Sequence, residues 1–433
     1  MADAPSGIIS ECLCGGLAAR RAASAAKPCL CALCASMAHC KARAHCVPKF
    51  ALVLVAALVS FGAPGCDTGR AGEAARPDAS LVPCGRALCG PGGTRFDWRG
   101  VTAFALADLI ADGRRPEARA FVEWAADTGF NVVRVLAMNH GWMDLSPEEG
   151  RRALPPLFAL AADHGLHVQV VALAGTRKEP YSTPTFLREQ VKAVSQLCAS
   201  APNCLLEIAN EPYHSSQARL DDPALMEQLQ EEVAGAVPVT WGASRHDAPG
   251  RLAGGTFVVV HLARGGDRWD RVGRIRQLDA LSRRTGKFVV VNEPIGAAEE
   301  PVRDRRDAQP QAFFAQGLLS RIFEVGSTFH CEDCLLAKVP AANQQECARA
   351  FVAGATLIPP DVRVTSYAAG AQDGPLPAAN EDAPVTTFAG TAGPRGWVVS
   401  LGPSAGPPDL QSGWRLVEQL SPWPEVKVWS MER

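Results

Sequence analysis

Residues 205–212 read Leu-Leu-Glu-Ile-Ala-Asn-Glu-Pro, and residues 288–294 read Phe-Val-Val-Val-Asn-Glu-Pro. In each stretch an apolar run of strand length ends in the tripeptide Asn-Glu-Pro. A carboxylate just past a buried strand is costly to keep there unless it is paired or used. Glu211 and Glu293, about 80 residues apart, therefore predict a pair of carboxylates that meet over one site.

The two stretches belong to a longer series of apolar, strand-like runs. The runs are Trp98–Phe104, Asn131–Ala137, His167–Leu173, Cys204–Ala209, Val237–Trp241, Phe257–His261, Phe288–Val291 and Ser327–His330. Helical patterns lie between or after them. These are Glu117–Thr128, a helix from Ser146 to about Gly165, Pro184–Ser200, Pro223–Ala234, Trp269–Thr285, Pro310–Val325 and Ala342–Ala355. Eight strands alternating with helical patterns in residues 94–357 predict a (β/α)8 TIM barrel, an α/β fold.

An open, doubly wound sheet is the alternative architecture for such an alternation. It rarely uses eight units, and no Gly-rich phosphate turn follows the first strand. The barrel is therefore favoured.

Residues 361–433 have a different texture, with short β-like runs between Gly and Pro turns and no helical pattern. They predict a small β-rich appendage. Its tryptophans could stack on sugar or form its own core, and the core is the favoured interpretation. They are Trp397, Trp414, Trp423 and Trp429.

Residues 1–66 read as an N-terminal extension with an export signal. Basic residues precede an apolar run, Phe50–Gly62, that is too short to span a bilayer. The ending Gly65-Cys66 resembles a bacterial lipoprotein signal, which predicts a lipid on Cys66 and a membrane anchor facing the periplasm or cell surface. Plain secretion and an uncleaved anchor remain alternatives. Met37 would give a signal of ordinary length, so residues 1–36 are expected to be untranslated or dispensable rather than a metal site.

Residues 67–93 are rich in Gly, Ala, Pro and charge, and predict a tether. In an exported chain the close cysteine spacings suggest local disulfides. The neighbours are Cys84 and Cys89, Cys198 and Cys204, and Cys331, Cys334 and Cys347. Which of the last three is free stays open, and zinc at the Cys-x-x-Cys pair is a weaker alternative. The balance of 43 basic and 45 acidic residues does not indicate nucleic acid.

A pair of carboxylates at the ends of barrel strands is the arrangement with which glycosidases break a glycosidic bond. Residues 96–102 and 129–134, together with the two Asn-Glu-Pro motifs, resemble clan A glycoside hydrolases, especially the cellulase-like family 5. The resemblance covers roughly residues 94–357 and implies a retaining mechanism on an oligo- or polysaccharide, with carbohydrate as partner and no metal or cofactor. Glu211 would be the acid/base, with a raised pKa, and Glu293 the nucleophile.

The resemblance also implies supporting roles for neighbouring residues. Asn210 would donate to the sugar 2-hydroxyl, and Arg134 would keep Glu293 charged or, alternatively, pair with Glu207. His261, which ends strand six, would line the cleft or be a buried core residue. Further cleft or stacking candidates are Trp142, Tyr213, His330 and His140.

The chain departs from the family pattern at three places. No His follows strand three, Ala263 stands where the family has a Tyr beside the nucleophile, and strand eight lacks the usual Trp. These departures indicate a divergent member, and the scarcity of aromatic residues favours a short oligosaccharide or a glycan end. The alternatives are a catalytically silent barrel that binds glycan or cell-wall polymer and, more weakly, a metal-dependent hydrolase that uses His261, His330, Glu332 and Asp333.

Overall fold

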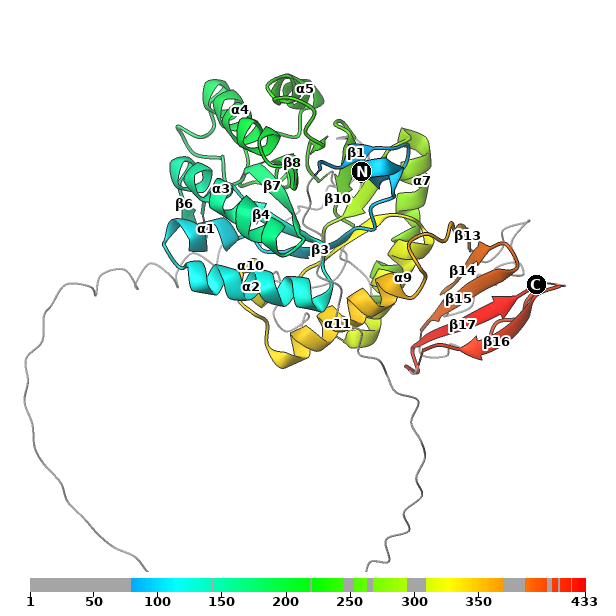
Figure 1. Cartoon of the computed structure of the whole chain (residues 1–433). Helices are drawn as coiled ribbons and strands as arrows, with labels where there is room; N and C mark the ends of the chain where they lie inside the picture. The colour runs from blue at the N-terminus through cyan, green and yellow to red at the C-terminus, as the bar shows by residue number, and fades with distance from the viewer. Residues whose placement is uncertain are drawn as a thin grey trace, which may run out of the picture. The chain divides into compact units, whose positions relative to one another are not determined.

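The computed structural model describes residues 79–433 except 142, 219, 244–252, 263–267, 294–308, 369–385, 403–406, 412 and 422. The described chain contains an eight-stranded parallel sheet, a five-stranded antiparallel sheet and two short hairpins (Figure 1). Cys66, Trp142 and Ala263 lie outside the described residues, as do most of the predicted N-terminal segments.

The parallel sheet is the predicted (β/α)8 barrel. Its strands, in chain order, are β3 (Arg99–Thr102), β4 (Val132–Leu136), β7 (His167–Leu173), β8 (Cys204–Ala209), β9 (Val239–Thr240), β10 (Phe257–Val260), β11 (Phe288–Val291) and β12 (Gly326–Phe329). Their spatial order is β10-β11-β12-β3-β4-β7-β8-β9, so each strand lies beside its neighbours in sequence. Thr240 of β9 forms a bridge with Gly255, just before β10, which brings the two ends of the sheet together.

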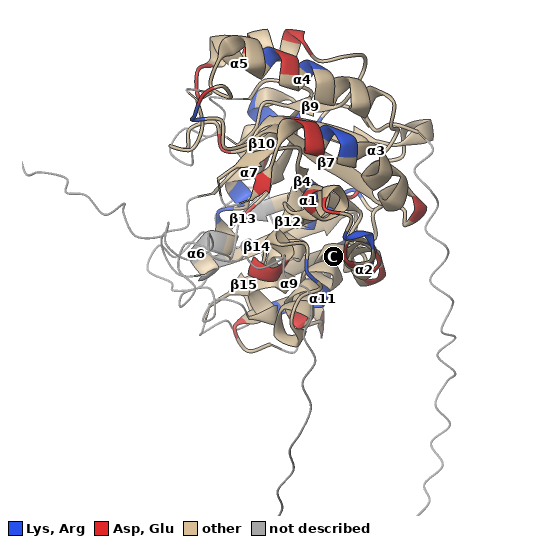
Figure 2. Cartoon of the chain, turned by 90° about the vertical axis from the view of Figure 1, so that its left-hand side faces the viewer, with Lys and Arg blue, Asp and Glu red and all other residues tan. Residues whose placement is uncertain are grey.

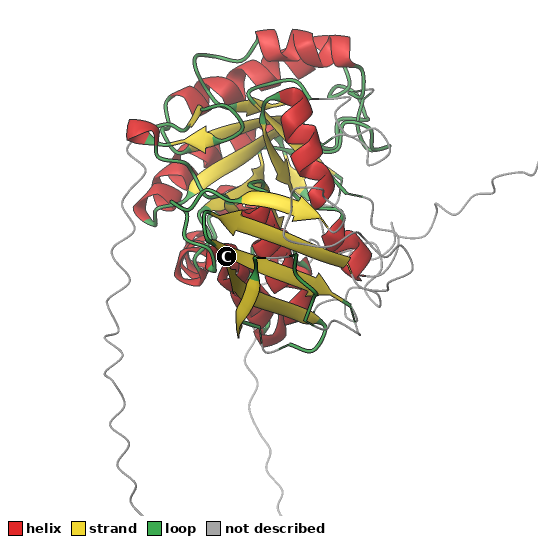
Figure 3. Cartoon of the chain, turned by 90° about the vertical axis from the view of Figure 1, so that its right-hand side faces the viewer, coloured by secondary structure: helices red, strands yellow, loops and turns green. Residues whose placement is uncertain are grey.

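Helices surround these strands, as Figure 3 shows with helices in red outside the yellow strands. The helices are α1 (Leu106–Ala111), α2 (Arg115–Thr128), α3 (Pro147–Asp163), α4 (Pro184–Ala199), α5 (Pro223–Glu231), α6 (Arg268–Gly273), α7 (Arg276–Thr285), α9 (Pro310–Ile322), α10 (Glu332–Leu335) and α11 (Ala342–Thr356). Acidic and basic residues are interspersed along them in Figure 2, in keeping with the near-neutral composition.

The predicted ends of α3 are confirmed. The Ser146 hydroxyl accepts from the Glu149 backbone N–H, and the Glu149 carboxylate accepts in return from the Ser146 N–H, which completes a capping box. Pro147 occupies the first turn, where its missing N–H costs nothing. Beyond the last turn Gly165 takes φ 73°, the left-handed conformation that ends many helices.

The prediction of one continuous helix over Trp269–Thr285 is wrong. The chain forms α6 and α7 instead, with a break after Gly273. Glycine is a poor helix former because it loses more backbone entropy than other residues, so a break at this point has a local cause. The short helices α1 and α10 lie in loops where no helix was predicted, and each is too short to show a clear period.

The N-terminal end of the barrel is closed by apolar packing. Trp98, Phe257 and Phe288 pack together inside the strands, and Leu81 and Leu88 join the same cluster. Leu88 belongs to the hairpin of β1 (Val82–Pro83) and β2 (Leu88–Cys89), in the segment assigned to the tether. The chain is thus anchored to the barrel from about Leu81 onward.

The C-terminal sheet has the strand order β13-β14-β15-β17-β16. Its strands are β13 (Thr365–Ala368), β14 (Thr386–Ala392), β15 (Arg395–Leu401), β16 (Arg415–Gln419) and β17 (Val426–Glu432). One face contributes Phe388 to the main core, where its ring lies 5.6 Å from that of Phe323. The four tryptophans pack within the described core clusters: Trp397 and Trp423 against the main core, Trp414 and Trp429 on the other face. The core interpretation of these residues is therefore favoured by the packing.

Three local disulfides are present in the described chain. They join Cys84 to Cys89, Cys198 to Cys204 and Cys331 to Cys334, and they leave Cys347 as a buried thiol. Burial raises the pKa of Cys347 to about 12, so this thiol is inert at neutral pH. Such bonds fit an exported protein. Within the described part of the chain, no helix has the length and apolar character needed to cross a bilayer.

His167, at the start of β7, gives the fold a pH dependence that can be measured. Burial lowers its pKa to about 4, and its Nδ1 has no hydrogen-bond partner among the described residues. Because the folded pKa lies below the ordinary value of 6.5, the unfolded chain takes up the proton first as the pH falls. This contribution to stability is complete above about pH 6.5 and is lost between about 6.5 and 4, an effect of roughly 3 kcal/mol.

We therefore expect His167→Gln, which cannot titrate, to lose less stability on acidification than the wild type. Urea unfolding of both proteins at pH 7.5 and pH 4.5 measures the difference directly, because all other titrating groups are shared. Equal losses of unfolding free energy in the two proteins would show that His167 has no part in the acid response.

Candidate active site

The polar residues at the C-terminal ends of the strands come together over the barrel. Asn210 and Glu211 follow β8, His261 follows β10, and Glu293 follows Asn292 at the end of β11. His261 and Glu293 are buried, at 4% and 5% exposure. The carboxyl ends of barrel strands are where the active sites of this fold lie.

Backbone geometry around Glu211 is unusual. Glu211 adopts φ 42°, in the left-handed region that non-glycine residues rarely occupy. Gly242 lies so close beneath the loop that a Cβ there would be 2.0 Å from the carbonyl oxygen of Ala209. Gln217 donates to the carbonyl of Asn210 and accepts from the Thr176 hydroxyl at 2.9 Å. Such a strained residue, fixed by its neighbours, is typical of a functional position.

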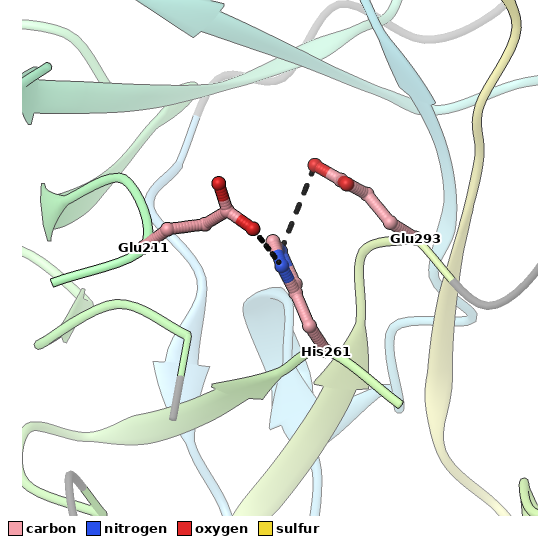
Figure 4. A group of neighbouring side chains, drawn as sticks. All are labelled: Glu211, His261 and Glu293. Atoms are coloured by element: carbon pink, nitrogen blue, oxygen red, sulfur yellow. Dashed lines mark hydrogen bonds and ion pairs between the residues drawn. The ribbon is translucent and has the colours of Figure 1, made fainter. Parts of the chain in front are cut away.

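Glu211, His261 and Glu293 form a compact group (Figure 4). One donor or acceptor atom from each lies within 4.8 Å of the other two, so an oxygen of Glu211 and an oxygen of Glu293 are no farther apart than that. The ring of His261 lies between the carboxylates: Nδ1 is 3.0 Å from Glu211 Oε1, and Nε2 is 3.7 Å from Glu293 Oε1. The predicted meeting of the two glutamates is therefore present in the structure.

Arg134, fully buried in β4, connects this group to the barrel interior. Its guanidinium makes two 2.8 Å hydrogen bonds to the carboxylate of Glu207 and donates to Asn210 Oδ1 at 2.9 Å. It also lies 3.4 Å from Glu293 Oε1. Arg134 therefore pairs with Glu207 and also faces Glu293, and its predicted effect on the charge of Glu293 stays a prediction.

The guanidinium of Arg134 stays protonated and positively charged. Burial alone would lower its pKa, but the charge and hydrogen bonds of Glu207, with Glu293 and Glu211 behind, raise it above the ordinary value. The guanidinium also lies over the ring of Phe104, 5.0 Å from its centroid. One permanent cation thus faces three carboxylates.

Glu211 does not have the raised pKa that its predicted role requires. Burial raises the pKa of Glu211, and the charge of Glu293 does the same. The hydrogen bond and charge of His261 outweigh both and lower it below its ordinary value. The sequence contains His261, but it does not show that the ring reaches Glu211, so the direction of the shift could not be foreseen.

The other predicted site residues are placed as follows. The Tyr213 hydroxyl donates to Glu211 Oε1 at 3.1 Å. His330 is buried, with Nε2 3.9 Å from Glu293 Oε2. His140 is exposed, and its ring lies 5.1 Å from that of Tyr181. Trp142 lies outside the described residues, so its predicted role stays a prediction.

Two residues of the network were not singled out from the sequence. Gln169 donates to Glu207 Oε2 at 2.8 Å, and Thr102 lies 3.0 Å from Nδ1 of His330. Gln169 is a polar residue in the middle of the apolar run His167–Leu173. A buried polar residue on a central strand is a signal for an internal partner, and it could have drawn attention to this position.

The group also has the residue types of a metal site, since it offers one imidazole and two carboxylates. The ring of His261 turns Nδ1 toward Glu211 and Nε2 toward Glu293.

We expect His261→Leu to raise the pKa of Glu211. The substitution removes the hydrogen bond and the charge that lower it and leaves burial and Glu293, which raise it. Carbon-13 NMR of labelled glutamate carboxyls, followed as a function of pH, measures the pKa of Glu211 in the wild type and in the variant. The Glu211→Gln protein identifies which signal belongs to Glu211. A pKa that stays in place or falls would mean that His261 does not control this carboxyl.

We expect Arg134→Met to destabilise the protein by about 3–5 kcal/mol, because Glu207 would be left buried without its partner. The double variant Arg134→Met, Glu207→Leu removes both charges and should recover most of the loss. Urea unfolding of the three proteins gives the free energies. A double variant no more stable than the single one would contradict this account.

Comparisons with known proteins agree with the fold. No protein-family profile and no curated protein sequence matches the chain. Among solved structures, one described as a glycoside hydrolase superposes with a TM-score of 0.58 at 14% identity, over 82% of this chain and 97% of the other. A glycoside hydrolase family 5 protein from Bacteroides vulgatus superposes with a TM-score of 0.55 at 13% identity, over 82% and 93%. The chain thus has the fold of these clan A glycoside hydrolases.

Proposed function

We propose that the protein is a retaining glycoside hydrolase that works by double displacement on a glycan. The observation that carries the proposal is the approach of Glu211 and Glu293 to within 4.8 Å, oxygen to oxygen, at the C-terminal ends of the strands. Retaining enzymes hold their two carboxyl groups roughly 5–5.5 Å apart, whereas inverting enzymes need about 6.5–9.5 Å to admit a water. The short approach supports the retaining class.

In the first step the carboxylate of Glu293 attacks the anomeric carbon, and the bond to the leaving oxygen breaks as that oxygen takes a proton from Glu211. Arg134, 3.4 Å from Glu293, keeps this nucleophile ionised. In the second step Glu211, now a carboxylate, takes a proton from water, whose oxygen displaces Glu293 from the sugar. The substrate regains a free anomeric hydroxyl, and both glutamates return to their starting forms.

The proton for the first step belongs to the pair of Glu211 and His261. These groups are hydrogen-bonded, so one proton can move between them. The lowered pKa of Glu211 means that this carboxyl gives up its proton more readily than an ordinary glutamate. The bond to Nδ1 of His261 gives Glu211 a route for taking up a proton before the first step and for passing one on in the second.

The site also supports a role in substrate binding for Asn210. Its Oδ1 is used by Arg134, so the amide presents Nδ2 as a donor for a sugar hydroxyl. Tyr213 contacts the acid/base directly and would stand beside the leaving group. Aromatic residues make up only 6% of the chain, and from this scarcity of stacking surfaces we infer a short oligosaccharide or a glycan end as substrate.

The fold comparisons support this function by analogy, since the same barrel carries glycoside hydrolysis in the superposed proteins. The disulfides fit work outside the cytoplasm. We also propose that Cys66 is lipidated and that the segment 67–93, predicted as a tether, connects this anchor to the barrel, with the part from Leu81 onward packed on the strands. The boundaries 94–357 for the barrel and 361–433 for the β-rich region complete the proposed domain organisation.

A silent barrel that binds glycan without cleaving it is the second candidate. The lowered pKa of Glu211 favours it, because an acid catalyst is expected to hold its proton more tightly. The histidine that causes the shift is itself a proton donor in contact with Glu211, so the arrangement is also suited to catalysis.

We expect Glu293→Gln and Glu211→Gln each to lower turnover of aryl glycosides by several orders of magnitude, with the exposed Glu227→Gln as the matched control. A 2-fluoro aryl glycoside of the accepted sugar should leave a covalent adduct on Glu293 of the wild type, detected by mass spectrometry of peptides. For Glu211→Gln, the loss should be smaller with activated leaving groups that need no proton.

Two other outcomes would support the alternative functions. A wild-type protein that cleaves no glycoside in a broad panel, yet binds glycans, would support the silent barrel. Loss of activity on treatment with a chelator, restored by a divalent ion, would instead support a metal-dependent hydrolase.

A further inference from the structure

The carboxylate of Glu293 is contacted on both of its oxygens. Oε1 faces Nη1 of Arg134 at 3.4 Å and Nε2 of His261 at 3.7 Å. Oε2 faces Nε2 of His330 at 3.9 Å. The terminal torsion of a glutamate is broad, so the side-chain rotamer alone does not fix the plane of the carboxylate. Contacts on both oxygens can fix it.

His330 is itself held firmly. It is 3% exposed and follows Phe329, the last residue of β12. Phe329 pairs in register with Val101 of β3, which brings His330 level with Thr102 on the adjacent parallel strand. Nδ1 of the ring then lies 3.0 Å from the Thr102 hydroxyl, and the edge of the ring meets Phe104 at 6.4 Å between centroids. One edge of the imidazole is therefore fixed to β3, and the other edge faces the nucleophile.

We propose that His330 is a positioning residue for the nucleophile Glu293, and that Thr102 holds the ring in the orientation that allows it. The inference rests on the proposed function and assigns a role within the same site. In the proposed arrangement the proton of the neutral ring is on Nε2, facing Glu293 Oε2 at 3.9 Å, and Nδ1 accepts from the Thr102 hydroxyl, 3.0 Å away. The opposite tautomer would turn a lone pair toward a carboxylate, which is repulsive.

This role differs from the substrate-binding role predicted for His330 from its place at the end of strand eight. A residue that stacks on sugar presents an open ring face to the substrate. His330 is 3% exposed, and Thr102, Phe104 and Glu293 lie around its ring. Its effect on catalysis should therefore appear in the chemical step and not in substrate binding.

Attack on the anomeric carbon needs an oxygen lone pair aimed at that carbon, and a small misplacement of reacting groups can cost about 100-fold in rate. We expect His330→Leu to lower kcat by about that factor, with KM changed less than about threefold. His330→Gln offers an amide N–H near the place of Nε2–H and should recover part of the rate. Thr102→Val, which keeps shape but loses the hydroxyl, should lower kcat by about tenfold, while Thr102→Ser should not.

The coupling of the two residues is the decisive kinetic test. If Thr102 acts only through the ring of His330, adding Thr102→Val to His330→Leu should cause no further loss of kcat. The rate of covalent adduct formation on Glu293 should fall in parallel with kcat, because the nucleophilic step is the one affected. Additive losses, or a raised KM with unchanged kcat, would overturn the proposal in favour of independent or substrate-binding roles.

A measurement on the wild type keeps the proposal testable even if a variant does not fold. Nitrogen-15 NMR of histidine-labelled protein reports which ring nitrogen carries the proton. The His330 signals are assigned by comparison with His330→Gln or, if that variant does not fold, by through-bond correlations. We expect Nε2–H, and Nδ1–H would overturn the proposal. A wild type with the expected tautomer that forms no adduct and cleaves no glycoside would instead refute the proposed function, and the positioning role with it.

Discussion

The bidentate ion pair between Arg134 and Glu207 is the interaction on which the site depends. Both side chains are fully buried and 2.8 Å apart, so neither charge could be kept inside the barrel without the other. The guanidinium also directs N–H groups at the side-chain oxygens of Asn210 and Glu293. A single buried cation thus fixes residues from two strand ends, and Glu207 keeps that cation in place between β4 and β8.

The sequence predicts most of the barrel because its signals are local. Apolar runs such as His167–Leu173 and Cys204–Ala209 coincide with β7 and β8 at both ends. Where a signal depends on tertiary context, prediction fails. The packing of Leu81 and Leu88 against the barrel depends on neighbours far along the chain, which periodicity does not reveal.

The residues of the candidate site also differ in how far the sequence predicts them. Glu211 and Glu293 are visible in the sequence because each ends an apolar run in Asn-Glu-Pro, and the barrel topology then brings them together. Their protonation is not visible, because it depends on where the ring of His261 lies. Gln169 and Thr102 are hidden for a related reason: each acts through one partner on a neighbouring strand, Glu207 for the first and His330 for the second.

The two ends of the barrel carry different tasks. At the N-terminal end, aromatic and aliphatic side chains pack with the hairpin that contains Leu88. Toward the C-terminal end the interior becomes polar, and buried atoms such as Gln169 Oε1 and Asn292 Nδ2 have no hydrogen-bond partner among the described residues. Unsatisfied polar groups of this kind cost stability. The apolar end can supply that stability, which leaves the polar end free to hold charged groups in the close arrangement that the proposed catalysis requires.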